Sequence, residues 1–459
     1  MLTLLIIFAC GGEPSSAPSS PAGGQEHQRI PGHGPHPGGP PPGGEMAAVT
    51  TPPGEYEPVG GPSSDPRSIL FISWDTVRAD RLGLYGGRVP TPNLNALAAS
   101  GGAWEQAITH FPETALSHWS MLTGVEPELH GNIPATGSSR YRGPTVAEIA
   151  GAHGYSTAAF IGGVTLTASA SGLHRGFDKY DDRWEWQRTD LKRPGSNVVE
   201  RARTWISQQT GDYFAFVHLF DAHHPYNPPA PYDTMFPAEG PRAPEVEEQL
   251  ALYDGEIAKL DDLLGQLMSV VDEDTVVVLT SDHGESFEHG YLYNHRESLW
   301  DNTLNVPLVI RGAGIEAGSR FAGQVALTDI FPTVLQLAGL PPDAKSQGVS
   351  LLDGSERPLI YSSTDPWMPQ RKLTLRGGGA KVIWHDSGDT ISYDLQTDPG
   401  EESPLSSVPS HLGGGDERYE ERIDAASGLQ RAELPSRHVP QHRVEQLRAL
   451  GYVGRHGEE

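Results

Sequence analysis

The feature of this sequence that most constrains its fold is the alternation of short, continuous apolar runs with longer segments of helical periodicity. The runs carry almost no interleaved polar residues, which is typical of strands buried on both faces of a parallel sheet. The helical segments supply the crossover connections that such a sheet needs. We therefore predict an α/β fold with a doubly wound, mostly parallel sheet. The predicted strands span residues 68–74, 157–161, 213–220, 275–280 and 306–310, and the predicted helices span 92–99, 145–152, 245–271 and 329–337.

After residue 355 the apolar runs become shorter and follow one another closely. Short runs separated by turn residues indicate antiparallel strands rather than crossover units. We predict a main domain over 67–355, a small antiparallel β subdomain over 356–400, and a polar tail over 401–459 that ends in a short helix at 443–450. The predicted strands of the subdomain span 358–362, 372–376, 380–384 and 390–394.

The N-terminal region predicts an export signal followed by a tether. Residues 2–9 are apolar but too few to span a bilayer, which takes about 20 residues. Residues 7–10 (IFAC) resemble a bacterial lipobox, which would make Cys10 the lipidated N-terminus of the mature protein. Residues 11–66 are rich in Gly, Pro and Ser, as flexible linkers are. We expect an exported lipoprotein of the bacterial cell envelope, periplasmic or on the surface; the alternative is a short apolar N-terminus with an incidental cysteine.

The overall charge and the cysteine content exclude several classes of function. The chain has 33 Lys and Arg against 59 Asp and Glu, a formal net charge of −26, so a general nucleic-acid or anionic-membrane binder is excluded. Contact with a membrane is expected through the N-terminal lipid only. The single cysteine excludes an internal disulfide framework and a cysteine-rich zinc module.

Polar clusters follow three of the predicted strands at the point where each strand ends. Asp75 follows the first, residues 221–224 (DAHH) follow the strand at 213–220, and residues 281–285 (SDHGE) follow the strand at 275–280. Ligands of open α/β sheets bind beyond the carboxyl ends of the strands, and carboxylate and imidazole groups are ligands of divalent metals. Taken singly, an aspartate after a strand is more often a helix cap and an Asp-His pair more often lies on the surface. Together the clusters predict a metal site.

Several motifs resemble, in the right order from residue 68 to 401, the sulfatase family of the alkaline phosphatase superfamily. The first, ISWDTVRAD at 72–80, matches the opening motif of the family, and TALSH at 114–118 with LTG at 122–124 matches its nucleophile motif. The family resemblance implies an alkaline phosphatase/sulfatase-like fold. Further matches lie at 91–94, 130–131, 281–285, 288–290, 305–308, 328–334, 393–395 and 398–401.

The resemblance also implies roles for particular residues. Asp75, Asp282 and His283 are expected to bind a metal, and Thr114 takes the nucleophile position and should also touch the metal. The remaining expected site residues are His223, which contacts the transferred anion, His295 near the leaving group, Arg78 as an anion ligand, and His118, a catalytic candidate that stands where the motif has arginine. His224 and His289 are interpreted as loop histidines.

The sequence departs from the family at the nucleophile. Sulfatases carry Cys or Ser there, oxidised to formylglycine, whereas this chain has Thr114, so no formylglycine is expected. Thr76 also replaces the second aspartate of the opening motif, which removes a usual calcium ligand. Threonine resembles the nucleophile of nucleotide pyrophosphatases/phosphodiesterases and of phosphoethanolamine and lipoteichoic acid transferases. We expect one divalent ion, Ca²⁺, Zn²⁺ or Mn²⁺, and possibly a second.

The leading hypothesis is therefore a metal-dependent hydrolase of anionic esters on a small molecule, glycan or lipid head group. Sulfate is implied by the family and phosphate by the residue chemistry of Thr114. One alternative is a transferase that passes a phospho-group to a lipid or glycan alcohol, and another is a catalytically weak binding protein. At Thr114 itself, the alternative to a nucleophile is a helix N-cap, a role that threonine fills well.

Overall fold

The computed structural model describes residues 67–132, 139, 141–184, 191–343, 345–354, 356–364, 372–385 and 387–420. All of them belong to one unit of mutually contacting residues. The predicted signal, Cys10, the linker at 11–66 and the helix at 443–450 lie outside the described residues.

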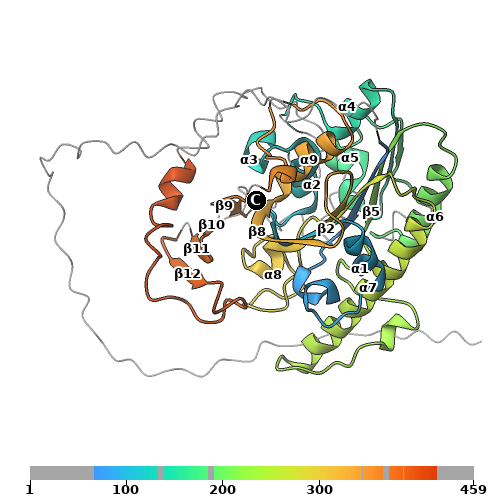
Figure 1. Cartoon of the computed structure of the whole chain (residues 1–459). Coiled ribbons are helices and arrows are strands. Elements are labelled where there is room, and N and C mark those ends of the chain that lie inside the picture. Colours follow the sequence, from blue (N-terminus) through green and yellow to red (C-terminus); the bar gives the residue numbers. More distant parts are fainter. Residues whose placement is uncertain are drawn as a thin grey trace, which may run out of the picture. The chain divides into compact units, whose positions relative to one another are not determined.

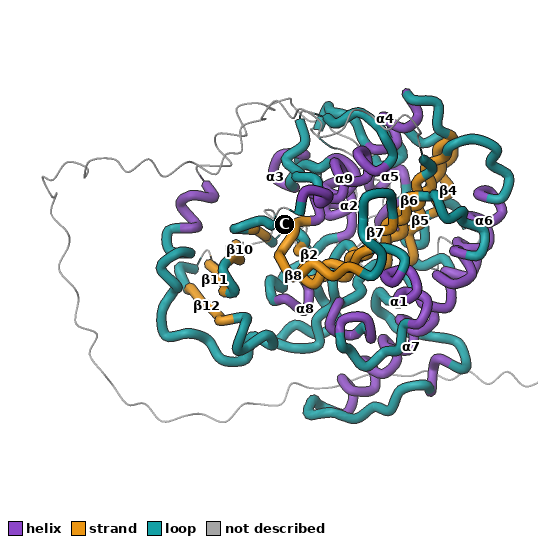
Figure 2. The backbone as a smooth tube through the Cα atoms, viewed as in Figure 1, coloured by secondary structure: helices purple, strands orange, loops and turns teal. Residues whose placement is uncertain are grey.

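An eight-stranded sheet forms the centre of the fold (Figures 1 and 2). Its strand order is β4-β3-β5-β1-β6-β7-β2-β8, and every neighbouring pair is parallel except those made by β7, which runs antiparallel to both β6 and β2. This confirms the predicted mostly parallel α/β sheet. The strands span β1 Ile69–Trp74, β2 Gly102–Ile108, β3 Ser156–Phe160, β4 Lys179–Asp181, β5 Tyr213–Leu219, β6 Val276–Ser281, β7 Asn305–Arg311 and β8 Ser319–Ala326.

Helices cover both faces of the sheet, because consecutive side chains of each buried strand point to opposite sides. Ile69 and Phe71 of β1 pack into the cluster formed with α2, α4 and α9, whereas Leu70 and Ile72 pack into the cluster formed with α1, α6 and α7. Burying one such side chain contributes roughly 1.5–3 kcal/mol, so the two clusters hold the layers together. The helices span α1 Pro92–Ala99, α2 Thr114–Thr123, α4 Val146–Ala152, α6 Gly195–Ile206, α7 Pro244–Met268 and α9 Ile330–Leu337.

The ends of three helices correspond to local capping signals. Pro92 opens α1, where its missing N–H costs nothing. Thr145 forms a capping box with Glu148 at the start of α4. Gly124 ends α2 in the left-handed conformation, with φ of 67°.

A separate antiparallel sheet of four strands follows the main sheet in sequence, as predicted, in the order β12-β11-β10-β9. Ile360, Ile383 and Tyr393 of this sheet pack with Trp300 and Leu304 of the main domain. The buried ammonium of Lys381 also pairs with Asp301 across this contact. The strands span β9 Ile360–Ser363, β10 Lys372–Gly377, β11 Ala380–His385 and β12 Thr390–Asp394.

Several elements were not predicted from the sequence: strands β2, β4 and β8 and helix α6. Strands β2 and β8 are only partly buried, so they have no continuous apolar run. Helix α6 has a polar majority and one apolar stripe. Shorter α-helices span α3 Pro127–His130, α5 Ala168–Ser171 and α8 Asp301–Leu304. Among the described residues, no helix combines the length and apolar character needed to cross a membrane.

Candidate active site

The carboxyl ends of β1, β5 and β6 lie in register at one edge of the sheet. Trp74, the last residue of β1, pairs with Leu219 of β5 and with Ser281 of β6. The residues that follow these strands, among them Asp75 and Asp282, are therefore delivered to the same place.

The turn after β1 joins two of the predicted metal ligands. Thr76 has φ of 61°, a left-handed conformation that is uncommon for a β-branched residue. In this conformation its N–H donates to Oδ1 of Asp282 at 3.2 Å, while its hydroxyl donates to the carbonyl of Asp75. Thr76, which replaces the family's second aspartate, thus joins the turn that carries Asp75 to the side chain of Asp282.

Asp75, Asp282 and His283 form a buried cluster, and one potential ligand atom from each lies within 4.8 Å of the others. Within the described part of the chain, Oδ1 of Asp75 and Oδ2 of Asp282 have no hydrogen-bond partner. His283 donates from Nδ1 to the carbonyl of Gly284 at 2.9 Å, which leaves Nε2 as the lone-pair nitrogen, 3.3 Å from Oδ2 of Asp282. Backbone-oriented imidazole and unpartnered carboxylate oxygens fit a divalent metal ion.

The electrostatics of this cluster also favour a cation. Burial, and then the neighbouring charge of Asp282, raises the pKa of Asp75 well above its ordinary value. Burial alone would raise the pKa of Asp282 too, but His283 and His118 lower it. Two buried carboxylates so close together cannot both ionise without a positive partner, and a divalent ion would supply it.

Thr114 lies at this cluster as the first residue of α2. The N-cap of the helix is Glu113, whose Oε2 accepts from the N–H of Leu116 at 2.9 Å. The N-cap interpretation of Thr114 is therefore wrong, because the preceding residue performs that role. The hydroxyl of Thr114 lies 3.4 Å from Nε2 of His283, the nitrogen that faces the carboxylates. Thr114 is thus placed with the metal-ligand candidates, at the positive end of a helix dipole.

Both ring nitrogens of His118 are used inside the fold. Nδ1 donates to the carbonyl of Thr114 at 2.7 Å, and Nε2 accepts from the hydroxyl of Ser73 at 2.8 Å. Burial lowers its pKa, so the ring is neutral. His118 therefore links the first turn of α2, through the carbonyl of Thr114, to Ser73 of β1.

His223 and His295 lie next to one another, and His295 also contacts His283. The ring of His295 stacks on His283 with centroids 4.1 Å apart and stands edge-on to His223 at 5.3 Å. His223 stacks on Phe220 at 4.4 Å and uses Nδ1 for the carbonyl of His224 at 2.6 Å. Burial lowers the pKa of both histidines well below the ordinary value, so both are neutral near pH 7.

The sequence analysis did not single out Glu285 or His218 as site residues. Glu285 is fully buried, and its Oε1 lies 3.2 Å from Nδ1 of His295. Burial raises the pKa of Glu285 to about 7, so this pair shares a proton near neutrality. His218 places Nε2 3.0 Å from Oδ2 of Asp75. The sequence feature that could have identified His218 is its position as a histidine within the otherwise apolar segment of β5.

The structure does not bring Arg78 to the cluster. Its guanidinium pairs with Asp80 at 2.6 Å and with Glu288 at 2.9 Å. It lines a polar cavity of about 1060 Å³, beside Arg376 and Glu401 of the C-terminal part of the chain. The strand-end carboxylate of Asp221 is also engaged elsewhere, with Lys259 of α7 at 2.7 Å.

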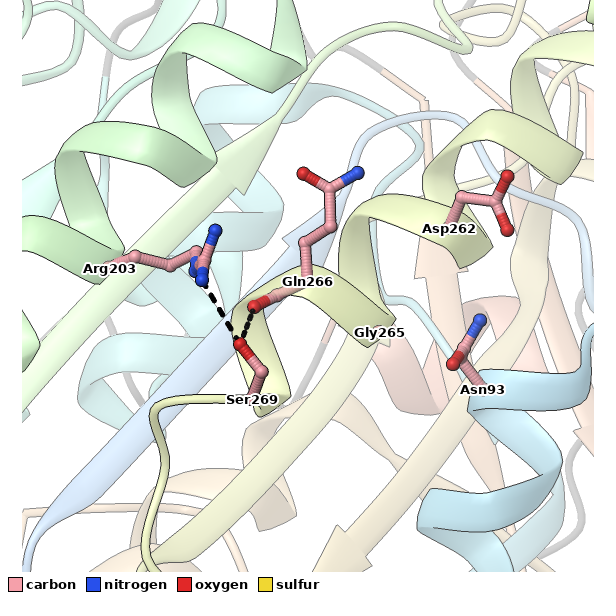
Figure 3. A pocket seen from close by; sticks show the side chains of 6 residues that line it. All are labelled: Asn93, Arg203, Asp262, Gly265, Gln266 and Ser269. Atoms are coloured by element: carbon pink, nitrogen blue, oxygen red, sulfur yellow. Dashed lines mark hydrogen bonds between the residues drawn. The ribbon is translucent and has the colours of Figure 1, made fainter.

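The two histidines that were interpreted as loop residues both stack on aromatic rings. His224 lies on Tyr293 at 5.1 Å, and His289 lies on Trp300 at 4.9 Å. A second hollow, of about 520 Å³, lies along the C-terminal part of α7, where Arg203 donates to Ser269 (Figure 3). None of the residues that line it belongs to the metal-ligand cluster or its histidines.

Comparisons with known proteins agree with this architecture. The ulvan-active sulfatase of Formosa agariphila is 24% identical over 427 residues, which cover 80% of this chain and 81% of that protein. Human arylsulfatase K is 30% identical over 180 residues, which cover 34% of this chain and only 33% of that protein.

Solved structures share the fold. The phosphonate monoester hydrolase of Agrobacterium radiobacter superposes with a TM-score of 0.66 at 20% identity, covering 81% of this chain and 100% of that one. BT1596, a 2-O glycosaminoglycan sulfatase, superposes with a TM-score of 0.64 at 17% identity, covering 83% and 96%. A family model described as Sulfatase matches residues 67–340, more than half of the 459 residues. With the strand-end cluster and the shared fold, this match shows that the chain belongs to the sulfatase family.

Proposed function

We propose that this protein is a metal-dependent hydrolase that cleaves phosphate monoesters or diesters by attack of the Thr114 hydroxyl. The observation that carries the proposal is the position of Thr114. Glu113 caps the helix, so the threonine side chain is not needed for that purpose, and its oxygen lies 3.4 Å from the ligand nitrogen of His283. Family membership supports hydrolysis of an anionic ester, and the solved relatives include both sulfatases and a phosphonate monoester hydrolase.

Asp75, Asp282 and His283 would hold the ion. When bound, a divalent ion would lower the pKa of the threonine hydroxyl and offset negative charge on the ester oxygens. The other contributions come from the chain itself. The N-terminus of α2 places the positive end of the helix dipole beside an anion above Thr114, and His118 holds that first turn in place through the carbonyl of Thr114.

The reaction has two steps on Thr114. In the first, the Thr114 oxygen, whose proton has passed to solvent, bonds to phosphorus as the ester oxygen leaves; the leaving oxygen takes a proton from Nε2 of His295, which regains one at Nδ1 from Glu285. In the second, water attacks phosphorus and the bond from phosphorus to the Thr114 oxygen breaks. The proton of the water passes to the neutral His223 and then to solvent, and a proton from solvent restores the His295–Glu285 pair. Because its pKa is lowered, His223 is unprotonated and can accept a proton, and the proton shared by Glu285 and His295 can be donated to the leaving oxygen.

The proposal is tested with metal-loaded enzyme on a panel of phosphate monoesters, phosphate diesters and sulfate esters. We expect the phosphate esters to be cleaved, Thr114→Ala to be inactive with an unchanged melting temperature, and Thr114→Ser to keep part of the activity. Mass spectrometry of the intact protein after a short pulse of substrate should show a phosphate-sized adduct on the peptide that contains Thr114. Activity in Thr114→Ala, or cleavage of sulfate esters alone, would contradict the proposal.

A further inference from the structure

The loop that carries His223 encloses the ammonium group of Lys192. The nitrogen Nζ donates to the carbonyls of Asp221 at 3.1 Å and of Pro225 at 2.7 Å, and also to the carbonyl of His223. An ammonium has three N–H groups and no acceptor, so these carbonyls use its full donor capacity. The acceptors belong to alternate residues of one short loop, which therefore turns three backbone oxygens to the same point.

Converging carbonyl oxygens repel one another unless a cation lies among them. Backbone oxygens are also ligands that proteins use for free cations. In this loop the cation is part of the chain. Burial lowers the pKa of Lys192 to about 8, a value that leaves the amine mostly protonated at pH 7. The carboxylates of Asp221 and Glu256, paired with Lys259, supply compensating negative charge.

Lys192 itself is held from a different part of the fold. Its backbone forms an antiparallel bridge with Gly163, and the N–H of Arg193 donates to the carbonyl of Gly162 at 2.7 Å. The guanidinium of Arg193 pairs with Asp181 of β4 at 3.2 Å. The ammonium is thus a fixed point to which the loop after β5 is attached.

We propose that Lys192 is a positioning residue that acts as a built-in cation: its ammonium gathers the carbonyls of Asp221, His223 and Pro225 and thereby holds the His223 ring in place at the active site. This inference rests on the proposed function, in which His223 is the base of the second step. It assigns the three carbonyls as a cation site whose occupant can be exchanged. Removing the side chain should open that site to a small ammonium ion from solution.

The test compares Lys192→Ala with the wild type, with and without ethylammonium. We expect kcat to fall by about 10- to 100-fold, as a displaced acid–base group does, with little change in KM and unchanged bound metal. Ethylammonium should restore part of kcat in a saturable manner. Lys259→Ala is the matched control, because the ammonium of Lys259 pairs with the carboxylates of Asp221 and Glu256 rather than with the three carbonyls. Ethylammonium should therefore not raise the kcat of Lys259→Ala.

A readout without turnover separates this inference from the proposed function. In protein labelled with ¹⁵N-histidine, the resonances of His223, assigned by His223→Gln, should shift in Lys192→Ala and return toward the wild-type position with ethylammonium. If the wild type cleaves no ester but these shifts occur, the proposed function fails and the positioning role stands. Wild-type kcat in Lys192→Ala, or loss of activity with no response of either kcat or the His223 resonances to ethylammonium, would overturn the positioning role.

Discussion

At the scale of single residues, the site is built from imidazole rings whose proton positions are set by backbone carbonyls. His118, His223 and His283 each direct Nδ1 to a carbonyl, from Thr114, His224 and Gly284 respectively. A neutral ring with its proton at Nδ1 has its lone pair at Nε2. The backbone thereby decides that Nε2 of His283 faces the carboxylates, and that Nε2 of His118 faces Ser73.

Replacement of Asp282 tests the metal site directly. Asp282→Asn removes one negative charge from the cluster while preserving its shape, so we expect bound metal, measured by elemental analysis, to fall by at least about tenfold. Asp221→Asn is the matched control, because that carboxylate also follows a strand but pairs with Lys259. Full metal occupancy in Asp282→Asn would remove this residue from the ligand set.

Glu288 should make the stability of the protein depend on acid pH. Burial opposes its ionisation, but Arg78, Asn302 and Arg242 outweigh burial and lower its pKa from 4.5 to about 2. The unfolded chain therefore binds more protons than the folded protein between these two values. The stabilisation is complete above pH 4.5 and is lost as the pH falls toward 2.

We expect Glu288→Gln to lose on the order of 2–3 kcal/mol of unfolding free energy at neutral pH, and to show a smaller further loss between pH 4.5 and 2. Denaturant titrations at several pH values measure both effects. The exposed Glu248 of α7, changed to Gln, serves as the comparison. Parallel stability curves for wild type and Glu288→Gln across this range would contradict the assigned pKa.

At the scale of elements, α2 begins with two adjacent residues of different kinds: its N-cap and the proposed nucleophile. Glu113 caps the helix, and Thr114 presents its hydroxyl to His283. Glutamate is an unusual N-cap, because its longer side chain must bend back to reach the N–H of Leu116. Because Glu113 caps the helix, the side chain of Thr114 is not needed for that role.

Because Glu113 and not Thr114 caps the helix, substitutions at these two residues should differ in their effect on the unfolding free energy. Glu113→Ala should lower the unfolding free energy by about 1 kcal/mol, the usual cost of a lost N-cap, whereas Thr114→Ala should leave it nearly unchanged. Thermal unfolding followed by circular dichroism measures both. Glu113→Gln keeps an acceptor oxygen and should recover most of the loss. A larger loss of stability in Thr114→Ala than in Glu113→Ala would contradict the assignment of Glu113 as the N-cap.

At the scale of the whole molecule, the C-terminal sheet is attached to the main domain by a small apolar cluster and by buried ion pairs. Lys381 of β11 is fully buried between Asp301, which opens α8, and Glu401, which follows β12. Such pairs are costly to separate, because each partner would remain as a buried charge. The polar cavity of about 1060 Å³ beside them is lined by residues of both the main domain and the C-terminal sheet.

The attachment of the protein to a membrane is proposed to depend on Cys10. The residue lies outside the described part of the structure, and the proposal rests on the apolar segment at 2–9 and the Gly/Pro/Ser-rich segment at 11–66. In a bacterial host that lipidates exported proteins, Cys10→Ser should move the protein from the detergent phase to the aqueous phase of a Triton X-114 partition. Ser68→Ala, in the folded domain, is a control that should partition as the wild type does. Unchanged partition of Cys10→Ser would exclude a lipid at this residue.

The sequence by itself determined the class of fold and, with the family resemblance, most of the candidate metal-ligand cluster. A strand with a continuous apolar run removes all its side chains from water only where both of its faces are buried. Strands β1, β3, β5, β6 and β7 were therefore predictable. Parallel strands that alternate with helices must present their carboxyl ends at one edge, which brings Asp75 and Asp282 together before any coordinates are known. The four short strands at the C-terminus were predictable from their turns and their spacing.

Only the tertiary structure decided which side chains serve one another across long separations. His218 meets Asp75 across 143 residues, Arg78 is drawn to Glu288 across 210, and Lys192 reaches the loop after β5 across about 30. Strands β2 and β8 were also missed, because β2 pairs with β7 and β8, segments that are distant from it in the chain. The periodicity of apolar residues in a short segment indicates which side chains are buried. A hydrogen bond between remote segments depends instead on how those segments are aligned, and that alignment exists only in the folded protein.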